Sequence, residues 1–367
     1  MESVDLYHVR MRLRAPFETS FGVEHDRDAI LLRLRSDIGE GWGECVAGNF
    51  PGYSYETVDT AWHILESFFL PAVLGQDLRD VEAYRAAISA YKGHPLARAG
   101  LELALWDVLA RAKGLSLARM LGGKAAKVPV GVSVGIQPDT SALVRTVADF
   151  VQAGYRRVKL KIKPGRDVDD VAAVRAAFPD LALQVDANSA YTLDDAPVFE
   201  AMDSFGLLLI EQPLAEDDIL DHAELQARLE TPICLDESIL SVRHARQALD
   251  CGACRVINIK PARLGGLREA VGVHDLCQAR GIPVWCGGML ETGIGRASNL
   301  ALASLPGFVL PGDISASDRY YAEDIARPRF VLNNGSTIDV PQGPGLGVEV
   351  DEDALRRFTL RHQKFGV

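Results

Sequence analysis

Short apolar runs alternate with longer amphipathic stretches through the last two thirds of the chain. Runs rich in Val, Ile and Leu end near residues 134, 161, 186, 211, 236, 259 and 286, and another lies near 308–310. Between them, helical stretches are expected at 140–153, 167–177, 192–204, 217–229, 241–250 and 266–280. Strands that alternate with helices in this way predict βα units around a parallel sheet.

The first third of the chain has a different pattern. Residues 4–17 and 29–45 predict strands of an antiparallel meander, and 55–70, 80–91 and 95–113 predict helices. The connection at 17–22 holds two aromatic residues, so it is either an ordinary loop or a lid over a nearby site. A break at 121–127 precedes the βα units, and the tail from about 325 is expected to be loop-rich and to pack back on the first domain. We therefore expect an α+β capping domain over 1–125, completed by 325–367, and a barrel with the active site over 126–324.

Charged residues close five successive apolar runs. Lys161, Asp186, Glu211, Asp236 and Lys260 follow one another at intervals of 25, 25, 25 and 24 residues, which is about one βα unit per step. Carboxyl ends of parallel barrel strands meet on one rim, so these five side chains should converge there. A single aspartate at the end of a strand has a simpler interpretation, because it often caps the helix that follows. Five charged residues at nearly equal intervals favour a functional site on the barrel rim.

Lysine also alternates with apolar residues at 159–163. Side chains on a strand point to opposite faces in turn, so Lys159, Lys161 and Lys163 should share one face. The same alternation occurs on exposed edge strands that avoid aggregation. Three carboxylates on neighbouring strands suit Mg²⁺, which prefers hard oxygen ligands, and Mn²⁺ or Co²⁺ could replace it.

Composition narrows the possible partners and compartment. The formal charge of −11 disfavours nucleic acid and anionic membranes, which bind basic patches. The six cysteines lack the dense spacing of a disulfide scaffold, and the pair at 251 and 254 has no second pair to complete a zinc site. The opening residues show no basic segment followed by an apolar one, and no apolar stretch is long enough to span a bilayer. We expect a cytoplasmic protein.

These residues resemble the enolase superfamily, specifically the N-acylamino acid racemase / o-succinylbenzoate synthase family of its muconate-lactonising subgroup. The resemblance covers nearly the whole chain and rests on PFETSFG at 16–22, GWGEC at 41–45, KLKIKPG at 159–165, DANSAY at 186–191, IEQP at 210–213, CLDES at 234–238, KPAR at 260–263, WCGGMLETGIGR at 285–296 and PGDISASD at 311–318. It implies a (β/α)₇β modified TIM barrel with an α+β capping domain. Family members often carry a bulky residue near position 48, where this chain has Gly48.

The resemblance also implies roles for individual residues. Lys161 and Lys260 would be the catalytic acid and base, and Asp186, Glu211 and Asp236 would bind Mg²⁺. Lys163 and Arg263 would support the two catalytic lysines; Arg263 would lower the pKa of Lys260, orient it, or merely hold a surface carboxylate. The substrate would contact Phe17, Ser133, Lys159, Asn188, Gly288, Met289 and Leu290.

The chemistry implied is removal of a proton α to a carboxylate. The resulting enediolate carries an extra negative charge, which a cation held in advance would stabilise. Deprotonation by one lysine and reprotonation by the other would racemise an N-acylamino acid. Lys161 acting alone as base and then acid would dehydrate a β-hydroxy acid to o-succinylbenzoate on the menaquinone pathway.

Other functions remain open at this point. Muconate-type cycloisomerisation or dipeptide epimerisation would use the same residues, a Schiff-base aldolase would also place a lysine on a barrel strand, and a metal-binding barrel without catalysis would show no proton exchange. We expect a small-molecule carboxylate substrate and a homo-oligomer, from dimer to octamer.

Overall fold

A computed structural model describes all 367 residues and contains two main sheets. The larger sheet has seven parallel strands in the order β11-β10-β9-β8-β7-β6-β5, so each strand lies beside its neighbour in sequence. Its strands are β5 (Val132–Val134), β6 (Arg157–Lys161), β7 (Ala182–Asp186), β8 (Ile210–Glu211), β9 (Ile233–Leu235), β10 (Val256–Ile259) and β11 (Val284–Cys286).

An eighth segment, 308–313, closes this sheet into a barrel. On one side the Asp313 amide donates to Cys286 O at 2.9 Å, and on the other the Gly131 amide donates to Gly312 O at 2.8 Å. Parallel bridges join Val284 to Phe308 and Val130 to Gly312. The (β/α)₇β barrel expected from the sequence is confirmed.

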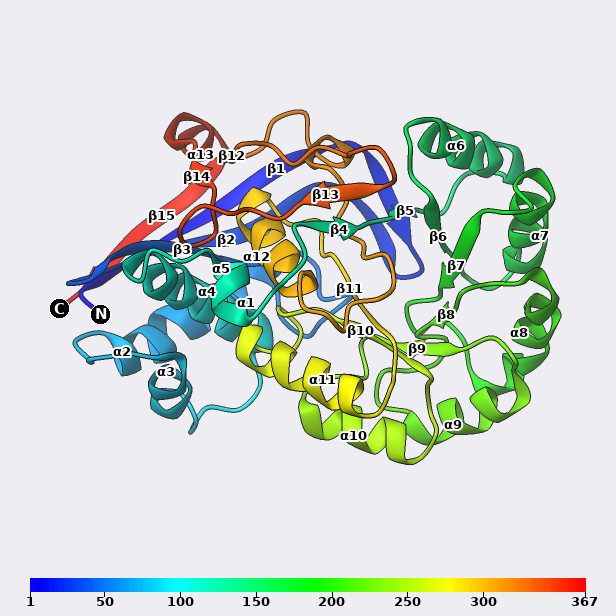
Figure 1. Cartoon of the computed structure of the whole chain (residues 1–367), viewed down its shortest axis with the longest axis horizontal. Helices are drawn as coiled ribbons and strands as arrows, with labels where there is room; N and C mark the ends of the chain where they lie inside the picture. Colours follow the sequence, from blue (N-terminus) through cyan, green and yellow to red (C-terminus); the bar gives the residue numbers. More distant parts are fainter.

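Seven helices follow the seven strands and cover the outside of the barrel (Figure 1). They are α6 (Thr140–Gln152), α7 (Asp167–Ala177), α8 (Ala196–Met202), flanked by the short turns η2 (Leu193–Asp195) and η3 (Asp203–Phe205), α9 (Ile219–Arg228), α10 (Val242–Asp250), α11 (Leu267–Ala279) and α12 (Gly293–Ala303). The first six helical stretches lie within two residues of the expected bounds. The stretch expected at 192–204 is divided into η2, α8 and η3.

The seventh helix, α12, was not expected. Its first residues belong to the glycine-rich run at 287–295, which predicts a turn, and every residue of the helix is buried. A helix that is buried all round has no polar face, so the amphipathic pattern that reveals surface helices is absent. Thr292 caps the start of the helix, and its hydroxyl accepts from the Ile294 amide.

The second sheet forms the cap and brings the two chain ends together. Its strand order is β15-β1-β2-β3, and the register pairs Ser3 with Gly366; Figure 1 shows both termini at the same edge. The strands are β1 (Ser3–Thr19), β2 (Gly22–Ser36), β3 (Gly39–Cys45) and β15 (Thr359–Gly366). Strand β1 continues through Phe17 to Thr19 and only Ser20 and Phe21 form the turn, so the connection is shorter than the 17–22 expected from the sequence.

Helices of the cap pack against this sheet around an apolar core of their own. They are α1 (Val58–Ile64), the π-helical η1 (Leu65–Phe69), α2 (Leu70–Val73), α3 (Val81–Ala87), α4 (Pro95–Ala112) and α5 (Leu117–Leu121). A larger core fills the barrel and continues under β1 and β2. None of the helices is both long and apolar enough to cross a bilayer.

The tail contains more regular structure than expected. It holds β12 (Ala326–Arg327), β13 (Thr337–Asp339), β14 (Glu349–Val350) and α13 (Glu352–Phe358) before β15, and the turn η4 (Ser317–Arg319) precedes it. Strand β13 pairs with β4 (Lys127–Pro129) at the start of the barrel. The domain bounds given above stay a proposal.

One buried carboxylate ties the tail to the cap. Asp107 of α4 is fully buried and accepts from the Trp42 amide of β3 at 2.8 Å and from the Leu346 amide of the tail at 2.7 Å. Arg111, one turn later, donates to the same carboxylate at 3.0 Å. The helix, the sheet and the tail thus share one acceptor group.

We predict that Asp107→Ala lowers the free energy of unfolding by about 3 kcal/mol, because it leaves two amides and one arginine without their acceptor. Urea denaturation followed by circular dichroism measures the change, and hydrogen exchange should become faster around 341–350. Asp77→Ala serves as the control, since Asp77 forms an exposed ion pair with Arg79; it should change the same quantity by less than about 0.5 kcal/mol. Equal losses in the two variants would contradict the assigned role.

Candidate active site

Two lysines of β6 point into the barrel and contact the carboxylates of the next strands. Lys159 Nζ lies 2.9 Å from Asp186, 2.8 Å from Glu211 and 2.6 Å from Asp313. Lys161 Nζ lies 2.6 Å from Asp186 and 2.5 Å from the Asn188 side-chain oxygen. Parallel register sets Lys161 beside Asp186 and Asp186 beside Glu211, so neighbouring strand ends bring these charges together.

Lys163 does not join this cluster. Strand β6 ends at Lys161, and the Lys163 side chain is half exposed, with its ammonium 2.9 Å from Glu18 of the cap. The lysine alternation continues two residues beyond the strand, so only two of the three ammonium groups share the inner face. Lys163 instead joins the barrel rim to β1.

The other catalytic candidate, Lys260, follows β10. Its ammonium lies 2.6 Å from Asp236, which is fully buried after β9. Arg263 donates to the other oxygen of Asp236 and also to the main-chain oxygens of Ile239 and Asn258. Arg263 therefore orients the Asp236 carboxylate inside the protein, and the surface alternative for this residue is wrong.

Burial and neighbouring charges act differently on the lysines. Burial would lower the pKa of Lys159, but the Asp186, Asp313 and Glu211 carboxylates outweigh it and raise this pKa well above its ordinary value. For Lys161, burial dominates and lowers the pKa, with Lys159 adding to the effect. Lys161 is thus the amine that loses its proton more readily.

Lys260 shifts in the opposite direction. Burial would lower its pKa, but Tyr53, Glu211 and Glu237 raise it overall. Burial would raise the pKa of Asp186, yet Lys159 and Lys161 hold it well below its usual range. Burial and the Asp186 charge raise the pKa of Glu211.

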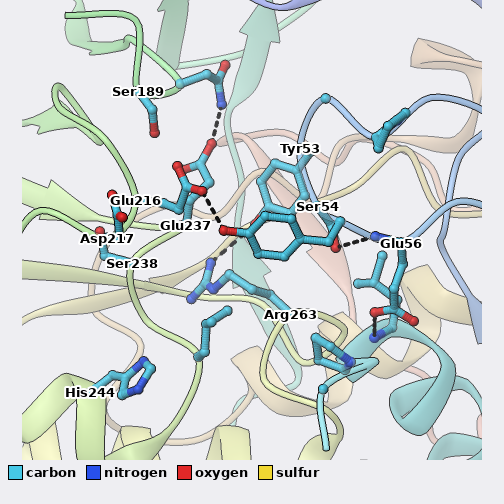
Figure 2. A pocket seen from close by; sticks show the side chains of 18 of the residues that line it. Tyr53, Ser54, Glu56, Ser189, Glu216, Asp217, Glu237, Ser238, His244 and Arg263 are labelled. Carbon is cyan, nitrogen blue, oxygen red and sulfur yellow. Dashed lines mark hydrogen bonds between the residues drawn. The ribbon is translucent and has the colours of Figure 1, made fainter.

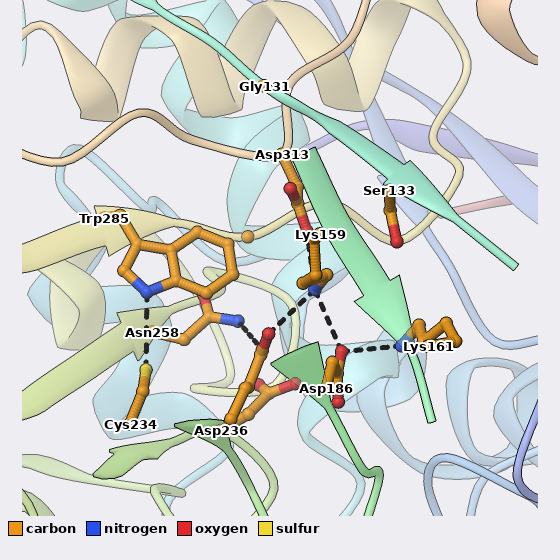
Figure 3. Close-up of polar contacts among 12 residues, drawn as sticks. Gly131, Ser133, Lys159, Lys161, Asp186, Cys234, Asp236, Asn258, Trp285 and Asp313 are labelled. Atoms are coloured by element: carbon orange, nitrogen blue, oxygen red, sulfur yellow. Dashed lines mark hydrogen bonds and ion pairs between the residues drawn. The ribbon is translucent and has the colours of Figure 1, made fainter. Parts of the chain in front are cut away.

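The carboxylates have the donor chemistry for a divalent metal, but the structure does not gather them around one point. No group of three His, Cys, Asp or Glu side chains is placed to hold an ion. Instead, the Lys159 ammonium contacts Asp186 (Figure 3). It also contacts Glu211, so two of the three proposed ligands already share one cation. Hard oxygen ligands with negative charge fit Mg²⁺, provided that the ammonium groups move aside.

The residues expected to contact substrate line one small cavity. All seven of them surround about 80 Å³ beside Lys161 and Lys260, and they are Phe17, Ser133, Lys159, Asn188, Gly288, Met289 and Leu290. Phe17 is buried with its ring edge-on to Tyr320. Asn188 and Leu290 have positive φ angles of 44° and 59°. Such strained backbone often occurs at functional sites.

One residue of the glycine run, Gly287, packs directly against the Lys260 side chain, which the sequence pattern did not predict. A Cβ at Gly287 would lie 2.6 Å from Cε of Lys260. The glycine therefore leaves room for the catalytic candidate itself, in addition to any approach of substrate to the backbone at Met289 and Leu290.

Sequence analysis missed several residues of the cluster. Asp313 lies at the end of the closing strand, where it contacts Lys159 and Arg157, and these charges hold its pKa well below the usual range. Its position in a strand-end motif, PGDISASD, was a usable signal. Asn258 donates to Glu211 at 2.7 Å from inside β10, and no charge pattern marks it.

Tyr53 of the cap was also missed as a site residue. Its hydroxyl donates to Asp236 at 3.0 Å and its ring lies 4.3 Å from the Lys260 ammonium. Tyr53 and Asn188 separate the small inner cavity from a larger one of about 720 Å³, which opens between the cap and the barrel loops (Figure 2). Neither Lys161 nor Lys260 lines the larger cavity.

Acidic side chains line this outer cavity. Figure 2 shows Glu216, Asp217 and Glu237 on its barrel side. Glu237 is buried, accepts from Asn188 at 2.9 Å, and has its pKa raised to about 7 by burial and by the Asp186 charge. The acidic lining makes the inner cavity, with its three lysines, the more suitable place for a substrate carboxylate.

Comparison with known proteins agrees with this geometry. Residues 1–122 match the family model described as "Mandelate racemase / muconate lactonizing enzyme, N-terminal domain", and residues 142–354 match "Enolase C-terminal domain-like". An N-succinylamino acid racemase of an Amycolatopsis species is 53% identical over 98% of this chain and 97% of its own. An o-succinylbenzoate synthase of Geobacillus kaustophilus is 51% identical over 98% and 96%.

A solved structure shows the same likeness in three dimensions. An enolase superfamily member from Listeria innocua has a TM-score of 0.95 and 42% identity, covering 100% of this chain and 98% of its own. The chain therefore belongs to the enolase superfamily, and within its muconate-lactonising subgroup to the N-acylamino acid racemase / o-succinylbenzoate synthase family.

Proposed function

We propose that this enzyme moves the α-proton of carboxylate substrates, either racemising N-acylamino acids or dehydrating a β-hydroxy acid to o-succinylbenzoate. One observation carries the proposal: Lys161 and Lys260 stand on either side of a series of three carboxylates. Strand β6 carries Lys161 and β10 leads into Lys260. Of the three strands between them, β7 ends in Asp186, β8 ends in Glu211, and Asp236 directly follows β9. Relatives named for each of the two reactions support both of them equally.

Membership of the superfamily implies a divalent metal, for which we propose Mg²⁺ held by Asp186, Glu211 and Asp236. When bound, it supplies positive charge where negative charge develops on the substrate carboxylate. Lys159 bridges Asp186 and Glu211, and Arg263 fixes Asp236 from behind. We propose that Lys159 binds the substrate carboxylate beside the metal.

The two catalytic lysines then divide the proton transfers. Lys161 takes or gives a proton on one side of the planar intermediate and Lys260 on the other, which inverts the stereocentre. In dehydration Lys161 removes the proton and protonates the leaving hydroxyl, while Lys260 stays an ammonium beside Tyr53. The cap supplies Phe17, Phe21 and Tyr53, which cover the cavity and exclude water. We expect a cytoplasmic homo-oligomer.

We predict that Asp186→Asn, Glu211→Gln and Asp236→Asn each lower turnover by at least about 100-fold, because each removes charge that holds the metal. Calorimetric titration should show weaker Mg²⁺ binding in each variant, with unchanged far-ultraviolet circular dichroism. Glu200→Gln, on the outer surface of α8, is the control and should match the wild type. Undiminished Mg²⁺ affinity in one variant would remove that residue from the ligand set.

We predict complementary proton exchange in the two lysine variants. Lys260→Ala should stop racemisation but still let Lys161 exchange deuterium into one enantiomer of an N-acylamino acid in D₂O, with retention. Lys161→Ala should exchange the opposite enantiomer, because the two amines face opposite sides of the same carbon. Proton NMR of each pure enantiomer measures this. A single variant that exchanges both enantiomers would refute the arrangement with two bases.

A further inference from the structure

The two lysines of the proposed mechanism are held by different neighbours. Lys260 contacts Asp236 at 2.6 Å. Lys161 contacts Asp186 at 2.6 Å (Figure 3) and the Asn188 side-chain oxygen at 2.5 Å. These two sets of hydrogen-bonding contacts have no residue in common, so a change in one set can act on one side of the substrate alone.

Asn188 gives Lys161 a contact that the proposed metal does not need. A lysine ammonium has three N–H groups, and two of those on Lys161 donate to Asp186 and Asn188. One direction remains for the inner cavity, which Lys161 lines. Asp186 is also a proposed metal ligand, so the Asn188 oxygen is the neighbour that can orient the Lys161 amine before and after it gives up a proton.

Only one orientation of the Asn188 side-chain amide allows this contact. The amide carries an acceptor oxygen and a donor nitrogen, and a half turn about its last bond exchanges their positions. The nitrogen cannot accept from the Lys161 ammonium, so the half turn breaks the contact. The Asn188 backbone is fixed by a 3.1 Å hydrogen bond to Asp186 and has a φ of 44°. Neither feature determines which end of the side-chain amide faces Lys161.

Glu237 selects the orientation. Its Oε1 accepts from Asn188 Nδ2 at 2.9 Å, and it does so whether or not the other oxygen carries a proton. Glu237 is only 8% exposed, and Oε2 is buried without a hydrogen-bond partner. The side chain therefore makes one hydrogen bond, and that bond fixes the nitrogen end of the Asn188 amide. The chemistry proposed above gives Glu237 no role.

We propose that Glu237 is a positioning residue for proton transfer by Lys161. It holds the Asn188 amide with the oxygen toward the Lys161 amine, which keeps the amine directed at the α-carbon. The inference rests on the proposed function and specifies how one of its two bases is aligned. Loss of the contact between Glu237 and Asn188 should slow exchange of the enantiomer that Lys161 deprotonates and spare the one that Lys260 deprotonates.

Two substitutions separate the position of Asn188 from the charge of Glu237, which also acts on Lys260. Glu237→Gln removes the charge and keeps an acceptor for Asn188, and its amide nitrogen takes the place of Oε2, which has no hydrogen bond to lose. Glu237→Leu removes both the charge and the acceptor. The difference between the two variants therefore reports the contact with Asn188.

The test follows deuterium exchange into each pure enantiomer of N-succinylmethionine in D₂O with Mg²⁺, measured by proton NMR. Lys260→Ala identifies the enantiomer that Lys161 exchanges. Relative to Glu237→Gln, Glu237→Leu should lower that rate about 10- to 100-fold, because a small displacement of the base is costly, and change the other rate less than about threefold. Glu237→Ala should give the same one-sided loss, so the test does not depend on one variant folding.

Matched controls separate this inference from the proposed function. Asp217→Asn removes an exposed carboxylate from the same side of the outer cavity (Figure 2) and should leave both rates unchanged. In an Asn188→Ala background, Glu237→Leu should cause no further loss on the Lys161 side, because the contact is already absent.

The outcomes that contradict the inference differ from those that contradict the proposed function. Equal losses for both enantiomers in Glu237→Leu, or a loss in Glu237→Gln as large as that in Glu237→Leu, would overturn the positioning role and leave the two bases in place. Absence of exchange in the wild-type enzyme would overturn the proposed function and the inference with it.

Discussion

The site depends on a single buried ammonium group. Lys159 Nζ lies within 3 Å of three carboxylates from three different strands, and the lysine and its partners are almost fully buried. Buried charges are costly unless they are paired, so removal of any partner leaves an uncompensated charge. The arrangement therefore fixes where β6, β7, β8 and the closing strand end. The three carboxylates also provide the negative charge that a divalent cation needs once the Lys159 ammonium moves aside.

The cap completes the site because the barrel alone leaves the lysines open. The long hairpin of β1 and β2 brings Phe17, Phe21 and Arg27 to the cavity, and the following loop brings Tyr53. Pairing of β15 with β1 anchors this hairpin through the other end of the chain. Precise chemistry at the barrel rim thus relies on contacts between residues that lie far apart in the sequence.

The sequence predicted the parts of the site that follow from local pattern. Strand periodicity and the 25-residue interval place Lys161, Asp186, Glu211, Asp236 and Lys260 on one rim because each depends only on its own βα unit. The prediction that Lys163 faces the site was wrong, because the alternation of lysine with apolar residues continues two residues beyond the end of β6. Tyr53 was missed because its contact with Lys260 is tertiary, and Asp313 because its partners lie on other strands. Helix α12 was missed because a fully buried helix has no polar face.

The most direct test of the central claim follows the wild-type enzyme on both enantiomers of an N-acylamino acid in D₂O with Mg²⁺. Proton NMR reports loss of the α-proton signal, and polarimetry reports the optical rotation. Two lysines on opposite sides of the substrate predict that both enantiomers exchange and that the rotation decays to zero from either start. Exchange of one enantiomer only, with the rotation unchanged, would contradict the arrangement.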